Sequence, residues 1–156
     1  MLPAANDPSA WQNFYVMMGG ANAALTGLIF VALSIHLREV LEHPTLRPRT
    51  VIALTVMTTQ IVIAAIVLVP QSTTLMGLEI LGVNAAFFAV DLRQGFSAVV
   101  SRARLASLVI RVVYVSSALS LIGDGLGGGF YLLAVAVIVT LGRTMTSAWA
   151  LLTAIG

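Results

Sequence analysis

Long apolar runs alternate along the chain with short stretches rich in arginine, proline or glycine. A helix that crosses a bilayer needs about 20 mostly apolar residues, and five runs of roughly this length occur. They predict five membrane-spanning helices, over residues 13–37, 50–69, 73–90, 105–123 and 129–150. No segment between them is long enough to divide the chain, so residues 1–156 are expected to form a single all-α transmembrane bundle.

The fourth run is the weakest of the five because Arg111 interrupts it and lowers its hydrophobicity. Without this run the protein would have four spans. Composition favours a membrane location, since 59% of the residues are hydrophobic and 9% are charged, whereas about a quarter are charged in ordinary soluble domains. So few charges cannot provide a polar shell, and the lipid bilayer is the expected partner of the surface.

The arginines predict the orientation of the bundle, because short cytoplasmic loops retain Arg and Lys. Six arginines fall in two of the four loops: Arg38, Arg47 and Arg49 lie before the second span, and Arg93, Arg102 and Arg104 lie before the fourth. The other two loops contain no basic residue. This alternation predicts an N-terminus outside the cell and a C-terminus in the cytoplasm.

Several functional classes are not expected. The basic residues form loop clusters rather than a basic surface, which argues against nucleic acid as a partner. The chain has no cysteine, which removes thiolate catalysis and sulfur-ligated metal sites. His36 and Glu39 could share a helix face, but two candidate ligands do not make a metal site. No nucleophile–base pair or phosphate-binding loop occurs, so neither an enzyme nor a cofactor is expected.

Uncharged polar residues recur near the middle of the predicted spans. They are Asn22, Gln60, Asn84, Ser116 and Ser117. An amide left unpaired in hydrocarbon costs several kcal/mol, so these groups are expected to bond to one another, to the backbone or to water. They form either hydrogen bonds that join helices or the lining of a water-filled pathway.

Glu79 is the most unusual residue of the third span, since it lies about six residues, or roughly 9 Å, inside its outer boundary. Acidic residues at such a depth often have a function. Gly82 and Ala86 share its helix face, which predicts that the carboxyl points at another helix. Glu79 is a candidate cation or proton site, or a neutral acid that donates a structural hydrogen bond.

Small residues are spaced four apart along the first span, at Gly19, Ala23 and Gly27. Such a pattern lets helix backbones approach closely in lipid. The partner of this face is either a neighbouring helix of the same chain or a second copy of the protein. A homo-oligomer is expected, because five short helices enclose too little volume to line a pathway alone.

Two stretches resemble the Orai family of calcium channels: residues 25–33, LTGLIFVAL, are similar to its first helix, and residues 52–63, IALTVMTTQIVI, to its second. The resemblance implies a hexamer whose first helices line a pore, with Gly27, Leu28 and Val31 facing the axis. Ile35 stands where that family has its selectivity glutamate, and the inferred orientation is opposite, so calcium selectivity is not implied.

The stretch WQNFYVMMGGANAALTGLIFVALSIHL resembles the start of a type of small bacterial membrane protein that has no assigned activity. This resemblance implies the bacterial inner membrane as the location. Together the observations favour an oligomeric channel or small permeation protein for ions or small solutes. The alternative is a noncatalytic scaffold or accessory subunit of a larger membrane complex, in which the same residues only join helices.

Overall fold

The computed structural model describes residues 7–42, 46–93, 102–123 and 128–155, and the regular structure in these ranges is all helical. The all-α prediction is therefore confirmed. Five long helices and one short one follow in order: α1 (Pro8–Ile35), α2 (Leu37–Glu42), α3 (Leu46–Leu68), α4 (Thr73–Arg93), α5 (Arg102–Ile122) and α6 (Gly129–Ile155).

The first two long helices begin earlier than the apolar runs predict. Helix α1 begins at Pro8 rather than at residue 13, because Asp7 caps it and its side chain accepts a hydrogen bond from Ser9 N at 2.9 Å. Proline is well suited to the first helical position, where its missing N–H has no intrahelical partner. Helix α3 likewise begins at Leu46 and includes Pro48 in its first turn. Polar and proline residues therefore extend these helices beyond their apolar parts.

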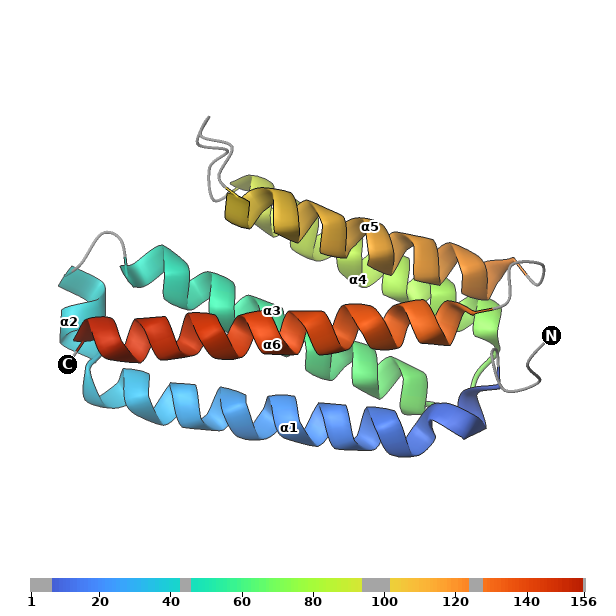
Figure 1. The fold of residues 1–156 in the computed structure, drawn as a ribbon, viewed down its shortest axis with the longest axis horizontal. Helices are drawn as coiled ribbons and strands as arrows, with labels where there is room; N and C mark the ends of the chain where they lie inside the picture. The colour runs from blue at the N-terminus through green and yellow to red at the C-terminus, as the bar shows by residue number, and fades with distance from the viewer. Residues whose placement is uncertain (1–6, 43–45, 94–101, 124–127, 156) are drawn as a thin grey trace.

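The long helices run roughly along one axis and reverse direction at alternate ends of the bundle (Figure 1). Helix α1 packs mainly on α3, α4 on α5, and α5 on α6, while α6 also contacts α3 and α1. The α4–α5 pair leans away from α6 towards the end that carries the C-terminus (Figure 1). The N- and C-termini lie at opposite ends of the bundle.

Three of the described helices are long and apolar enough to cross a membrane. These segments are Pro8–Ile35, Thr50–Leu68 and Gly129–Thr146, in α1, α3 and α6. Helices α4 and α5 carry shorter apolar stretches, Thr73–Ala89 and Leu108–Ile122. The chain is thus a helical bundle compatible with a membrane, and the five-span topology remains a prediction.

Of the six arginines that predict the orientation, Arg38 is the one whose side chain lies within the described part of the chain. Arg38 is exposed, and its Nε lies 3.0 Å from Glu42 Oε1, one turn further along α2. The side chains of the other five are outside the described residues: Arg47, Arg49, Arg93, Arg102 and Arg104. The short helix α2, which the apolar pattern did not predict, holds the first of these charges beside the end of α1.

Aromatic side chains join the first turns of α1 to the start of α6. The Trp11 ring stacks against Phe130 with a centroid distance of 6.1 Å and meets Tyr131 edge-on at 4.7 Å. Tyr15, one turn further along α1, is fully buried and also contacts Phe130. These contacts fix α1 against α6 at the end of the bundle that carries the N-terminus.

Candidate functional site

Four of the five predicted midplane residues lie inside the bundle. Asn22, Gln60, Asn84 and Ser117 are all buried, whereas Ser116 is exposed. The exposure of Ser116 follows from its position next to Ser117, because adjacent residues on a helix point about 100° apart. Four residues of the predicted layer thus lie inside the single chain, and the fifth, Ser116, lies on its surface.

Two of the buried amides bond to their own helix. Asn22 Nδ2 donates to Met18 O at 2.8 Å, and Asn84 Nδ2 donates to Ile80 O at 3.0 Å. Each bond reaches back by one turn to a carbonyl four residues earlier. Each amide therefore satisfies one of its two N–H donors within its own helix.

Gln60 joins three helices through a group of side chains that we call the polar core cluster, made of Gln60, Tyr114 and Thr140. Gln60 Nε2 donates to the Tyr114 hydroxyl at 2.7 Å, which connects α3 to α5. The Thr140 side chain of α6 lies beside the Tyr114 hydroxyl, and its own Oγ1 donates to Ala136 O at 2.6 Å. All three residues are buried.

Sequence reasoning missed Tyr114 and Thr140, although both carry hydroxyl groups within predicted spans. Tyr114 lies three residues before Ser117, which places them on one face of α5. Ser117 Oγ donates to Gly129 O at 2.8 Å, so this face contacts the start of α6. The spacing of Tyr114 and Ser117 is thus the signal that could have identified the cluster.

Some buried polar atoms have no protein partner among the described residues. They include Asn22 Oδ1 and Gln60 Oε1, whose side chains are 1% and 2% exposed, and the Tyr15 hydroxyl. A buried acceptor without a hydrogen bond costs about 1–3 kcal/mol. The interior therefore contains hydrogen-bond acceptors and a hydroxyl group that bond to none of the described residues.

Glu79 lies on the exposed side of α4 and reaches back to the α3–α4 turn. Its Oε2 accepts a hydrogen bond from Gln71 Nε2 at 2.8 Å, and the same nitrogen lies 3.1 Å from Ile66 O. Gly82 and Ala86 are also exposed, so this face of α4 does not meet another of the described helices. The cation or proton role of Glu79 remains a prediction, while its contact with Gln71 ties α4 to the turn.

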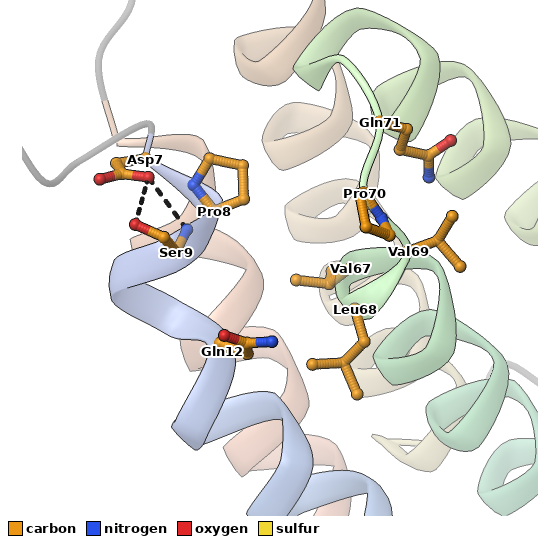
Figure 2. Close-up of a pocket in the computed structure, with 9 residues that line it drawn as sticks. All are labelled: Asp7, Pro8, Ser9, Gln12, Val67, Leu68, Val69, Pro70 and Gln71. Atoms are coloured by element: carbon orange, nitrogen blue, oxygen red, sulfur yellow. Dashed lines mark hydrogen bonds between the residues drawn. The ribbon is translucent and has the colours of Figure 1, made fainter.

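A pocket of about 350 Å³ lies beside this turn, between the first turns of α1 and the end of α3. Figure 2 shows Pro8 and Gln12 facing Val67 and Leu68 across it. Its polar groups come from Asp7, Ser9, Gln12 and Gln71. Asp7 is engaged as the helix cap, with Ser9 Oγ donating to it at 2.8 Å. The pocket is therefore a partly polar opening at one end of the bundle.

The predicted small-residue face of α1 is divided between the inside and the outside of the bundle. A Cβ built at Gly19 would lie 3.1 Å from Ala64 Cβ, so Gly19 permits close packing on α3. Ala23 is exposed, and a Cβ at Gly27 would meet nothing within 4 Å. Leu28 and Val31 beside Gly27 are also exposed. Gly19 thus packs on a neighbouring helix of the same chain. The outward part of the face, at Ala23 and Gly27, has no partner within the described chain.

Comparisons with known protein families, with curated proteins and with solved structures found no match for this chain. The resemblance of residues 25–33 and 52–63 to Orai helices therefore has no support beyond those residues. The functional interpretation depends on the polar core cluster, the buried acceptors and the outward face of α1.

Proposed function

We propose that this protein is an integral membrane permeation protein or channel for ions or small solutes, which acts as a homo-oligomer in the bacterial inner membrane. The observation that carries the proposal is the polar interior of an otherwise apolar bundle. A helix bundle that only needs to be stable in lipid gains nothing from buried acceptors without partners, because each of them costs free energy. Their presence favours a bundle whose interior accommodates a polar species.

Two features support a pathway along the bundle axis. The polar core cluster lies in the interior where α3, α5 and α6 meet, and the pocket at the N-terminal end adds further polar groups. A solute that leaves water for the bundle interior would meet polar groups first in this pocket and then at the polar core cluster. The tight packing of the remaining core means that passage requires helices to move relative to one another.

The five-span topology belongs to the same proposal. All five long helices extend along the bundle, and the termini at opposite ends are what an odd number of spans requires (Figure 1). In this topology the N-terminus is outside and the C-terminus is cytoplasmic. Arg111, which weakens the fourth run, has its guanidinium 5.4 Å from the centre of the Phe88 ring, so an aromatic face on α4 attracts its positive charge.

A second function is favoured by the outward face of α1. Gly20 and Gly27 are open to the outside, and Val16, Val31 and Ile35 continue the same apolar surface. A surface of this kind fits another transmembrane helix closely, which suits an accessory subunit or scaffold of a membrane complex as well as a homo-oligomer. In the accessory-subunit alternative the buried polar groups only join helices.

Reconstitution separates the two functions. Purified full-length protein in liposomes should increase the flux of at least one small solute or ion above that of empty liposomes. The Tyr114→Phe variant removes the central hydroxyl of the polar core cluster with little change in volume, and this flux should fall. Absence of flux under solute, potassium, sodium and proton gradients would leave the accessory-subunit function.

A further inference from the structure

The hydrogen bonds of the polar core cluster determine which way each group points. Thr140 Oγ1 donates its proton to Ala136 O at 2.6 Å, so it has no proton left to donate to Tyr114. The Tyr114 hydroxyl accepts a hydrogen bond from Gln60 Nε2 at 2.7 Å. Only the amide nitrogen of Gln60 can fill this role. The amide oxygen, Gln60 Oε1, must then point away from Tyr114.

The orientation of Asn22 is determined in the same way. Its Nδ2 donates to Met18 O, and a carbonyl oxygen can only accept, so the amide cannot be turned round. Asn22 Oδ1 is left without a hydrogen-bond partner among the described residues, as is Gln60 Oε1. Both side chains thus present an unpartnered acceptor, while each amide nitrogen uses one of its two hydrogens in the bond described.

Helical rise places residues 22 and 60, which carry the two acceptors, at about the same level of the adjacent helices α1 and α3. Helices α1 and α3 run antiparallel (Figure 1), and Gly19 packs against Ala64. From this contact Asn22 lies three residues, about 4.5 Å, along α1, and Gln60 lies four residues, about 6 Å, along α3 in the same direction. The spacings of three and four keep both on the faces that meet.

The chemistry of this site selects its occupant. Two carbonyl oxygens attract a hydrogen-bond donor or a cation, but every buried polar residue of the described chain is uncharged: Asn22, Thr50, Gln60, Asn84, Ser117, Ser120, Thr140 and Thr144. A cation in a low-dielectric interior without a counter-charge carries a large desolvation penalty. A neutral molecule with O–H or N–H groups carries no such penalty.

We propose that Asn22 Oδ1 and Gln60 Oε1 form a binding site for a small neutral hydrogen-bond donor between α1 and α3, and that such molecules are the permeating species. This inference rests on the proposed permeation function and narrows its substrate class from ions or small solutes to neutral solutes. Water, urea and short polyols have suitable chemistry.

The test uses the full-length protein in liposomes, with urea and glycerol as neutral probes and potassium and sodium as ionic ones. Osmotic reswelling measured by light scattering reports the neutral solutes, and encapsulated fluorescent indicators report the ions. We expect faster reswelling than in empty liposomes and no added ion flux. The wild-type comparison of neutral solutes with ions needs no variant, so it remains decisive even if a substituted protein misfolds.

Substitutions then locate the site. Asn22→Leu and Gln60→Leu each remove one acceptor and are expected to lower the urea permeability by about five- to tenfold, the effect of losing one hydrogen bond. Asn84→Leu is the matched control, because Asn84 makes the same bond to its own helix but lies on α4. It should leave the urea permeability unchanged.

The outcomes distinguish the inference from the function on which it rests. Ion flux without urea or glycerol flux would overturn the neutral-solute inference and leave a permeation protein. Flux of neither class would overturn both. Two results would show that the site does not lie between α1 and α3. One is a neutral flux that Asn84→Leu lowers as much as the other two substitutions do. The other is a neutral flux that Asn22→Leu and Gln60→Leu leave unchanged in folded protein.

Discussion

Gly77 of α4 lies directly against the backbone of Ala118 on α5. A Cβ built at Gly77 would be only 2.7 Å from Ala118 O and equally close to Ile122 Cγ1. Real Cβ atoms essentially never approach so closely, and a backbone oxygen cannot move aside as a flexible side chain can. The absence of a side chain at residue 77 therefore sets the distance between α4 and α5.

This contact predicts that Gly77→Ala destabilises the bundle by about 1–3 kcal/mol, because the added methyl overpacks the α4–α5 interface. Gly82→Ala is the control on the same helix, since a Cβ there meets nothing within 4 Å. It should be neutral or stabilising by up to about 1 kcal/mol, because alanine is the better helix former. Reversible denaturation in detergent measures both, and equal effects would contradict the close approach.

Tyr114→Phe should lower the free energy of unfolding by about 1 kcal/mol, in the range observed for hydrogen bonds between membrane helices. The change leaves the Gln60 amide without its acceptor inside the bundle. Tyr131→Phe is the matched control, because Tyr131 is 44% exposed and lies outside the polar core cluster. If both variants unfold alike, the Gln60–Tyr114 bond contributes nothing to stability.

The contact of Glu79 with Gln71 predicts different outcomes for two substitutions. Glu79→Gln keeps an acceptor for the Gln71 amide, so stability and transport should both survive. Glu79→Leu removes the acceptor and should lower the melting temperature by loosening the α3–α4 turn. Stable Glu79→Gln protein that has lost transport, or the pH dependence of transport, would instead assign Glu79 to a cation or proton site.

The outward position of Gly27 makes it a clean probe of assembly. Gly27→Leu should leave the single chain folded, since a Cβ built at Gly27 meets nothing within 4 Å on the neighbouring described elements and the side chain starts in open space. It should break a homo-oligomer that packs through this face, because a bulky side chain separates helix backbones. Mass measurement of the detergent-solubilised protein reports the change. An unaltered oligomer would exclude this face of α1 from the interface.

Gly19→Leu provides the contrast. Its side chain would press on Ala64 inside the bundle, so it should reduce the stability of the chain itself. A variant at residue 19 that alters assembly but not unfolding would mean that α1 and α3 are not packed as described.

Reporter fusions at the two ends of the chain examine the topology. Five spans and the arginine distribution predict an N-terminal reporter that is active outside the cytoplasm and a C-terminal reporter that is active inside it. Reporters on the same side would reduce the number of spans to four and remove α5 from the membrane. The proposed route through the polar core cluster would then lose one of its helices.

The sequence alone determined that the chain forms long helices compatible with a membrane. Apolar runs near 20 residues leave the backbone few alternatives in lipid, because only a helix satisfies every N–H and C=O within one segment. The polarity of Asn22, Gln60 and Asn84 also indicated an interior with hydrogen-bonding groups. The short helix α2 and the early starts of α1 and α3 were missed, because caps and prolines determine them rather than hydrophobicity.

Only the tertiary structure decided which faces meet. A helix that is apolar on all sides has no amphipathic pattern to mark its inner face, so the sequence did not distinguish Gly19, which packs on α3, from Gly27, which lies outside. The bond between Gln60 and Tyr114 joins residues 54 positions apart. Glu79 likewise has its partner Gln71 because α4 folds back at the turn. Such pairings depend on how the helices rotate and cross, which packing determines and local sequence does not.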